Sequence, residues 1–414
     1  TERERGTKIQ LSNPLTQYQY PSDEDDQSHP NIFINMTRHL YLCGDIGGTN
    51  ARFSLFASSR TDGFDYSKLS GADVDLGKGG NEVSLGEQVF MCKNHSSLAE
   101  IITLFLSKYN TSKEPLYCMC LAVAGPVNNN TAKITNLPWL IDGAALADSF
   151  KAHKVVLLND FVGIGYGLLA LSSKDLQVVH PGCGKVNPTG VKAVIGAGTG
   201  LGECFLTHNG RDYDVWPAEG GHADFAPRNR TEFEILEHIL HAENAKPNQT
   251  HPVDRVSVER VTSGSGLPNI YHCLARKHPD QVNPDIAKLI ADKGILAGSV
   301  IAENAQTGKC LVCVKTMDVF CSTYGAEAGN LCLKTLPTGG LYIAGGIAMK
   351  VMDIMKKNNQ FVSAYLAKGR MSQVLNQFPI YLITHPNVGL LGSQVTCRRI
   401  LHQADSTRVI RSKL

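Results

Sequence analysis

Apolar runs alternate with polar, turn-forming stretches from residue 40 onward, and many of the runs end at glycine, asparagine or aspartate. A short apolar run between turn formers is typical of a buried strand. The pattern predicts strands at residues 40–44, 52–56, 116–123, 155–158, 191–195, 340–344 and 379–383. Residues 45–50 separate the first two strands and contain Gly47 and Gly48, so we expect a β-hairpin there.

Helices are predicted where apolar residues recur at helical spacing. Residues 97–109 place Leu98 and Ile101 on one face, as an amphipathic helix requires. Residues 231–241 and 284–306 have helical composition and spacing as well. Strands interleaved with helices, with glycines at the strand ends, indicate an α/β protein.

The segment Gly165-Tyr-Gly167-Leu-Leu-Ala170 matches the loose GxGxxA fingerprint of dinucleotide-binding folds. Residues 159–162 separate it from the preceding strand, however, and no strand that ends in an acidic residue follows at the expected distance. We therefore interpret this segment as a small-residue helix that packs closely on a sheet.

Residues 1–39 differ from the rest of the chain. Residues 17–29 are rich in polar and acidic side chains, with four consecutive acidic residues at 23–26, and they offer little to bury. We expect an arm without chemistry of its own, either disordered or draped on the body of the protein.

The composition favours a globular protein and gives no sign of a nucleic-acid or membrane partner. The chain has 414 residues, enough for two domains, and is 43% hydrophobic and 19% charged, as soluble globular proteins are. Lys and Arg number 40 against 38 Asp and Glu, which leaves a net charge of +2 and no basic footprint for DNA, RNA or an anionic membrane. The longest apolar stretches, 116–127 and 341–349, are too short to span a bilayer.

Twelve cysteines are present, and several lie inside apolar runs, among them Cys118, Cys120 and Cys204. Cysteine behaves there as a small hydrophobe, so we expect buried free thiols in a reducing compartment. Cys310 and Cys313 have CxxC spacing but no second pair and no nearby histidine cluster. This favours a structural role over zinc or redox chemistry.

The two ends of the sequence predict where the protein is located. The first five residues are polar and lack the apolar core of a secretory signal. Ser412-Lys413-Leu414 is the tripeptide that the peroxisomal import receptor reads at a carboxyl terminus. We therefore expect that receptor as a partner and a peroxisome-type organelle as the compartment.

Three glycine-rich turns at the ends of predicted strands are candidates for phosphate binding. They are Asp45-Ile-Gly-Gly-Thr-Asn50, Gly196-Ala-Gly-Thr-Gly-Leu-Gly202 and Gly339-Gly-Leu-Tyr-Ile-Ala-Gly-Gly346. Glycine lets backbone amides approach an anion, and the carboxylate of Asp45 can hold a hydrated Mg²⁺ beside phosphates. An ordinary hairpin turn explains the first motif equally well, but three separated turns favour a nucleotide site. No P-loop sequence occurs in the chain.

A set of polar residues lies between these turns and is suited to binding a sugar. Its members are Asn159, Asp160, Glu219, His222 and Glu259. The first two end the strand 155–158, and open α/β sheets bind ligands at such ends. Taken singly, a solvated carboxylate or a satisfied core histidine is the ordinary explanation. Together these side chains supply the acceptors and donors that adjacent sugar hydroxyls require.

In this order, the motifs resemble those of the bacterial-type glucokinases, within the hexokinase–actin–heat-shock chaperone superfamily. The resemblance runs from about residue 40 to about residue 401. The matching segments are 45–50, 124–126, 134–139, 158–161, 198–202, 219–227, 258–260, 263–267, 344–347 and 387–392. Glu219-Gly-Gly-His-Ala-Asp-Phe-Ala-Pro227 is the most specific of them, because the superfamily shares the glycine turns. With residues 412–414 the chain is similar to the glycosomal glucokinases of kinetoplastids, which implies a glycosome.

The resemblance implies the actin-like, ribonuclease H-like two-domain ATPase fold, with a ligand cleft between a small and a large α/β domain. After the arm at 1–39, residues 40–170 and 388–414 would form the small domain and residues 171–387 the large one. Families of this type often form dimers, so a homodimer is an expectation. Residues 181–187 look like an addition to the bacterial pattern. The cysteine-rich zinc signature of the related repressor–kinase family is missing from the sequence, so we expect no structural zinc.

The resemblance also implies ATP-dependent phosphorylation of glucose at its 6-hydroxyl, the entry step of glycolysis, with a role for each candidate residue. Asp160 would be the general base. The other sugar hydroxyls would be held by Asn136, Asn159, Glu219, His222 and Glu259. The ATP phosphates and Mg²⁺ would be held by Asp45, Gly47, Gly48, Thr49, Asn50, Gly198, Thr199 and Gly200, with Asp45 reaching the metal through water. Gly345 and Gly346 would border the adenosine.

Two alternatives stay open at this point. The first is a kinase of another hexose or of an amino sugar, because one sequence does not reveal what the pocket tolerates at the sugar 2-position. The second is a non-catalytic sugar-sensing protein on the same fold. A regulator of that kind would need a DNA-binding helix-turn-helix, and the acidic stretch before Leu40 lacks one.

Overall fold

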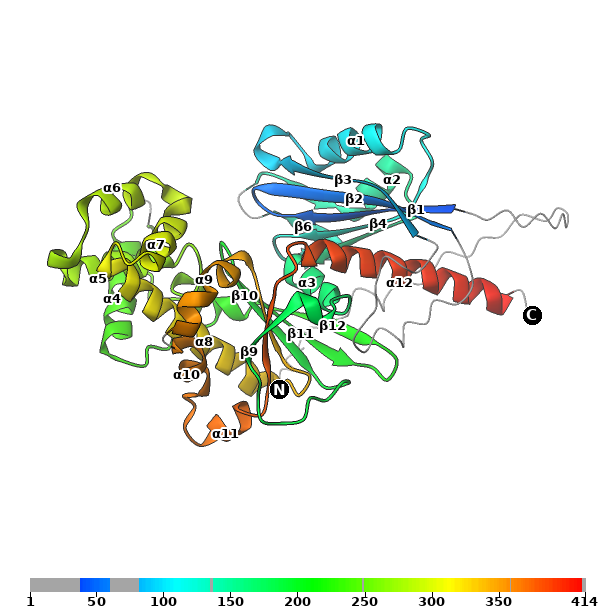
Figure 1. The fold of residues 1–414 in the computed structure, drawn as a ribbon. Helices are drawn as coiled ribbons and strands as arrows, with labels where there is room; N and C mark the ends of the chain where they lie inside the picture. The colour runs from blue at the N-terminus through cyan, green and yellow to red at the C-terminus, as the bar shows by residue number, and fades with distance from the viewer. Residues whose placement is uncertain (1–37, 60–81, 135–136, 248, 358, 412–414) are drawn as a thin grey trace, which may run out of the picture.

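The computed structural model describes residues 38–59, 82–134, 137–247, 249–357 and 359–411. Two mixed β-sheets lie beside each other, with helices on their outer faces and two helices between them (Figure 1). This arrangement confirms the predicted α/β class.

The first sheet has the strand order β3-β2-β1-β4-β8, in which β1, β4 and β8 are parallel. Its strands are β1 (Arg38–Ile46), β2 (Asn50–Ser59), β3 (Glu82–Met91), β4 (Leu116–Val123) and β8 (Lys154–Asn159). Helices α1 (Leu98–Tyr109) and α2 (Gly143–Phe150) pack on one face through a shared apolar core. A small sheet of β5 (Val127–Asn128), β6 (Thr131–Lys133) and β7 (Leu140–Asp142) connects β4 to α2.

The predicted hairpin is present as β1 and β2, but its turn is shorter than expected. Asp45 and Ile46 still pair with Arg52 and Ala51 across the two strands. The turn therefore comprises residues 47–49 alone, and Asp45 belongs to the strand.

The second sheet has the strand order β12-β11-β10-β13-β14-β9, with β10, β13 and β14 parallel. Its strands are β9 (Leu176–His180), β10 (Lys192–Ala197), β11 (Leu201–His208), β12 (Tyr213–Ala218), β13 (Leu341–Ala344) and β14 (Ile380–Ile383). Ala193 and Ile195 of β10 face a helical core, whereas Val194 faces the first sheet, as the period of two in a strand requires.

The helical core lies on the face of the second sheet that points away from the first sheet (Figure 1). Its helices are α4 (Arg230–Asn244), α5 (Leu267–Lys277), α6 (Pro284–Asp292), α7 (Ala297–Gln306), α8 (Leu311–Thr335), α9 (Gly346–Lys357), α10 (Gln360–Leu366) and α11 (Ser372–Leu375). The predicted helix at 284–306 is in fact two helices, α6 and α7, and Gly294, at a φ of +50°, lies between them.

Helices α3 (Asp160–Leu168) and α12 (Val388–Arg411) lie between the sheets (Figure 1). Glycines let them approach their neighbours closely. A Cβ on Gly165 would come 2.5 Å from the side chain of Val215 in β12, and one on Gly167 would overlap the carbonyl oxygen of Val388 in α12. The prediction of a small-residue helix packed closely on a sheet is therefore confirmed.

Several predictions fall on residues that the structure does not describe. They are the arm over residues 1–37, the sugar-binding role of Asn136 and the targeting tripeptide at 412–414, all of which stay predictions. All twelve cysteines are described and free, and all except Cys183 and Cys273 are buried, as expected for structural thiols. Among the described helices, none has both the length and the apolar character needed to cross a bilayer.

Candidate functional site

The parallel strands of the first sheet end at one edge and bring two predicted segments together there. Ile46 of β1 lies opposite Val123 of β4, which in turn lies opposite Asn159 of β8. The next residues along the chain are therefore the glycine turn at 47–49 and Asp160. Carboxyl ends of parallel strands are where α/β sheets bind ligands.

The first glycine turn is fixed by backbone hydrogen bonds and leaves its tip exposed. The Gly47 amide donates to the Asn50 carbonyl at 2.9 Å, and the Cys92 amide donates to the Thr49 carbonyl at 2.9 Å. The Cys92 thiol also donates to the Gly47 carbonyl, at 3.4 Å. Thr49 and Asn50 are both exposed, so both are accessible to a ligand.

Asp45 lies two residues before this turn and is half-buried. Burial raises the pKa of its carboxyl group, and Arg52, opposite it on β2, acts to lower that pKa. Helix α12 reaches the same group, since a Cβ on Gly389 would lie 3.2 Å from the carboxylate. A partly desolvated carboxylate beside exposed backbone amides fits a hydrated Mg²⁺ that is bound together with phosphates.

The second glycine turn connects β10 to β11, and the loop before α5 holds it in place. The Gly264 amide donates to the Gly198 carbonyl at 2.8 Å, and the Ser265 amide donates to the Thr199 carbonyl at 3.3 Å. Apart from its chain neighbours, no atom of the described residues lies within 4 Å of the position that a Cβ on Gly198 would take. The turn is therefore rigid and open on one side, as a backbone that receives a phosphate should be.

The third glycine turn follows β13, the parallel neighbour of β10. Gly345 has a φ of +89°, in the left-handed region that favours glycine, and its Cβ would lie 2.6 Å from the carbonyl oxygen of Ala197. Gly346 then begins α9, with open space where its Cβ would be. The second and third turns thus lie side by side next to a helix N-terminus, an arrangement suited to phosphate binding.

Asp160 begins α3 at the point where the two sheets approach each other. Its Oδ1 accepts a hydrogen bond from the Phe161 amide at 2.9 Å. The Phe161 ring lies against the backbone of Gly196 and Gly202 in the second sheet, so closely that a Cβ on Gly196 would come 2.8 Å from it. Asp160 directly follows β8 of the first sheet, and the packing of its neighbour Phe161 holds it close to the second sheet.

The pKa of Asp160 reflects this position between the sheets. Burial of its carboxyl group raises the pKa to about 6, opposed by the hydrogen bond from Phe161. The charges of Asp45, on the first sheet, and of Glu219, after the last strand of the hairpin β11–β12, contribute to this rise. A carboxylate with a pKa near 6 is suited to act as a general base at neutral pH.

Asn159 has a structural task that the sequence pattern did not reveal. Its Oδ1 caps α3 by accepting from the amides of Phe161 and Val162, at 2.9 and 3.3 Å. Its Nδ2 donates to the carbonyl oxygen of Gly125, at 3.1 Å. The side chain therefore caps the helix and keeps one amide hydrogen for a ligand, and the predicted sugar contact stays a prediction.

The predicted sugar residues Glu219 and His222 share one loop, which ends in the short helix η4 (Gly220–His222). The carboxylate and the imidazole are 3.9 Å apart, and both side chains are more than half exposed. Arg255 donates to the His222 carbonyl, and the Val258 amide donates to the Ala223 carbonyl at 2.9 Å. The loop is thus tied to the segment that carries Glu259.

Glu259 joins this loop to the second glycine turn. Its Oε2 accepts a hydrogen bond from the Leu201 amide at 2.9 Å, and a Cβ on Gly200 would overlap the same oxygen. Glycine at position 200 therefore makes room for a carboxylate between the predicted phosphate and sugar sites.

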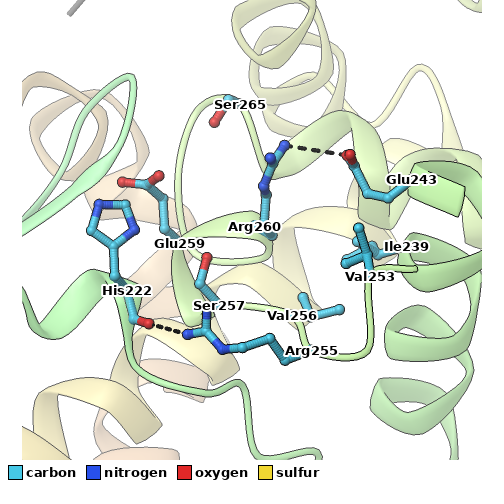
Figure 2. Close-up of a pocket in the computed structure, with 10 residues that line it drawn as sticks. All are labelled: His222, Ile239, Glu243, Val253, Arg255, Val256, Ser257, Glu259, Arg260 and Ser265. Atoms are coloured by element: carbon cyan, nitrogen blue, oxygen red, sulfur yellow. Dashed lines mark hydrogen bonds and ion pairs between the residues drawn. The ribbon is translucent and has the colours of Figure 1, made fainter. Parts of the chain in front are cut away.

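A pocket of about 350 Å³ opens beside the predicted sugar residues. Figure 2 shows His222 and Glu259 next to each other on one side of it. The lining residues are His222, Ile239, Glu243, Val253, Arg255, Val256, Ser257, Glu259, Arg260 and Ser265. On the opposite side, Arg260 forms an ion pair with Glu243 at 3.3 Å (Figure 2). Ser257 and Arg260 flank Glu259 in the sequence and could have been anticipated. Glu243 lies on α4, and no local motif marks it.

Comparison with known proteins gives consistent matches over most of the chain. The family model described as Glucokinase matches residues 42–400. The chain is 38% identical over 370 residues to the glucokinase of the cyanobacterium Trichormus variabilis, which covers 87% of this chain and 99% of the relative.

Solved structures match with similar coverage. A glucokinase from an Antarctic psychrotroph superposes with a TM-score of 0.67 at 29% identity, covering 87% of this chain and 99% of that one. The glucokinase of Leishmania braziliensis superposes with a TM-score of 0.63 at 19% identity, covering 86% and 92%. The second match shows a shared fold, which is the two-domain actin-like ATPase fold expected from the sequence.

Proposed function

The chain belongs to the glucokinase family, and from this premise we propose that it transfers the γ-phosphoryl group of ATP to the 6-hydroxyl of glucose with Asp160 as the general base. One observation carries the proposal. A carboxylate whose pKa is raised to about 6 lies between glycine turns suited to phosphates and a carboxylate–imidazole pair suited to sugar hydroxyls.

The three glycine turns bind the nucleotide in this proposal. The turns at 47–49 and 198–200 surround the phosphates, with the amides of residues 48–49 and 199–200 as donors, and Gly345 and Gly346 border the adenosine. Asp45 would hold Mg²⁺ through water, and the metal would neutralise charge on the β- and γ-phosphates. Phosphoryl transfer requires mainly alignment and neutralised charge from the protein, which these groups supply.

The sugar is held by side chains on the other side of Asp160. The carboxylates of Glu219 and Glu259 accept hydrogen bonds from hydroxyls, and His222 adds a ring nitrogen. Because Glu259 also accepts from the Leu201 amide, the sugar site and the phosphate turn are fixed relative to each other. Asp160 then accepts the proton of the 6-hydroxyl as that oxygen attacks the γ-phosphorus.

The test is ADP release measured with a panel of hexoses and with no sugar. We expect glucose to stimulate ADP release strongly, with glucose 6-phosphate formed in equal amount. Stronger stimulation by an amino sugar or another hexose would identify the alternative kinase. Sugar binding without ADP release would identify a sugar sensor and would overturn the proposal.

A further inference from the structure

Glu203 is a buried carboxyl group that the proposed reaction does not use. It lies on β11 opposite Ala218 of β12, and its side chain is 2% exposed. Among the described residues, no hydrogen-bond partner is available to its Oε1. A buried polar group with an unsatisfied oxygen is costly, so its presence needs a reason.

The carboxyl group lies directly beneath the loop that carries Glu219 and His222. A Cβ on Gly220 would overlap Oε2 of Glu203, and one on Gly221 would overlap the carbonyl oxygen of Leu201. The backbone of this loop therefore rests on β11, with the Glu203 carboxyl group as the contact next to Glu219.

The charges around Glu203 disfavour its ionised form. Glu327 of α8 is 4% exposed, and its Oε2 accepts from Asn330 at 2.9 Å, while no partner for its Oε1 is found in the described part of the chain. Burial, with a smaller contribution from the charge of Glu327, raises the pKa of Glu203 to about 8, and Lys334 acts in the opposite direction. The titratable groups of α8 that interact with Glu203 are Tyr324, Glu327, Cys332 and Lys334. Cys204, the next residue on β11, points to the other face of the sheet, and the loop meets Glu203 through the backbone of Gly220.

We propose that Glu203 is a positioning residue of the sugar site, which carries a proton at neutral pH and, in that neutral form, supports the backbone beneath Glu219 and His222. When it loses the proton, a buried negative charge appears beside Glu327 and against the backbone of Gly220. Because a buried charge without a partner is costly, the loop above it is displaced to admit water, and the sugar is bound more weakly. This inference rests on the proposed function, because the loop matters only if it binds the sugar.

The test is the glucose KM measured between pH 6.5 and pH 9.5 in the full-length wild type and in Glu203→Gln. Glutamine imitates the protonated acid and does not titrate. In the wild type we expect the glucose KM to rise at least fivefold as the pH passes 8, with little change in the KM for ATP. In Glu203→Gln the glucose KM should stay constant over the same range.

Two further variants make the test specific. Burial lowers the pKa of Lys192 to about 8 as well, but Lys192 begins β10, at the end away from the site, so Lys192→Met should keep the wild-type rise. Glu327→Gln removes a charge that raises the pKa of Glu203, so the rise should begin at lower pH. This variant also provides a readout if Glu203→Gln does not fold.

The outcomes separate this inference from the proposed function. A wild type that phosphorylates glucose with a flat KM profile, or a Glu203→Gln variant with the wild-type rise, overturns the positioning role alone. A rise lost in Lys192→Met instead of Glu203→Gln does the same. If no sugar stimulates ADP release in the wild type, the proposed function fails, and the inference fails with it.

Discussion

At the residue scale, Asp160→Asn tests the general base most directly. Asparagine keeps the size of the side chain and one acceptor for the Phe161 amide, but it does not take a proton. We expect kcat to fall by about 10²–10⁴-fold, the usual contribution of a general base, while the glucose Kd changes by less than about threefold. Steady-state kinetics and calorimetric titration measure the two quantities. Asp148→Asn, on the exposed face of α2, is the matched control, and a kcat for Asp160→Asn within tenfold of that control would contradict the role.

The raised pKa of Asp160 predicts where activity is lost in acid. The base works only when it is ionised, and burial has raised its pKa from 3.8 to about 6. We therefore expect kcat/KM for glucose to be constant between pH 7 and pH 8, below the rise in KM assigned to Glu203, and to fall about tenfold per unit below pH 6. An ordinary aspartate would sustain activity down to about pH 4. A pH profile at saturating ATP and Mg²⁺ distinguishes the two, and full activity at pH 5 would contradict the assignment.

Polar residues at strand ends or near glycines could be selected from the sequence, because such positions favour ligand-facing backbone. Asp160 was selected as the residue that follows a buried strand, Glu219 as the neighbour of a double glycine and Glu259 as a residue ahead of a glycine-rich loop, and their roles stay predictions. The same reasoning did not reveal that Asn159 caps α3 and contacts Gly125. It also missed Glu203, because a carboxylate inside a strand pattern gives no sign that it is buried under a distant loop.

At the element scale, the close packing of α3 against α12 is testable through Gly167. Gly167→Ala would push a methyl group into the Val388 carbonyl, and a backbone atom is unable to move aside by changing rotamer. We expect a loss of about 3 kcal/mol in the free energy of unfolding, at the upper end for overpacking. Gly308→Ala is the control, since it meets no atom within 4 Å and adds only strain at a φ of +68°, which costs about 1 kcal/mol. Equal losses in urea unfolding would show that the contact is unimportant.

Elements with one buried face could be predicted, and elements buried on all sides could not. Residues 97–109 show a clear apolar stripe and form α1. Helix α8 is buried at positions all around its axis, so its apolar residues show no periodicity and the sequence pattern did not reveal it. Strands β11 and β12 were missed for a different reason, since the prediction used continuous apolar runs and these strands are interrupted by polar residues.

At the scale of the whole molecule, two arginines of α12 connect it to both sheets. Arg398 forms an ion pair with Glu82 at the start of β3. Arg399 forms one with Asp212, at 2.6 Å, and donates to the carbonyl oxygen of Tyr213 in β12. The sequence indicated three glycine turns and, through the family resemblance, a small and a large domain. It could not show that one terminal helix would be fixed to both of them, because these partners are far apart in the chain. The proposed division at residues 170 and 388 stays a prediction.

A sugar bound between the two halves should stabilise the whole protein, and Glu259 should determine by how much. At a glucose concentration of 100 times Kd, the expected gain in unfolding free energy is about 2.7 kcal/mol. A hydrogen bond to a charged group contributes about 1.5–3 kcal/mol, so Glu259→Gln should raise the glucose Kd about 30-fold. At the same glucose concentration the gain should then shrink to about 0.9 kcal/mol.

Glu243→Gln removes a carboxylate from the opposite side of the same pocket and should keep the full gain. Chemical unfolding with and without glucose measures both variants. If Glu259→Gln kept the full gain while Glu243→Gln lost it, the sugar would lie on the Glu243 side of the pocket. Asp160 would then be too far from the reacting hydroxyl to accept its proton.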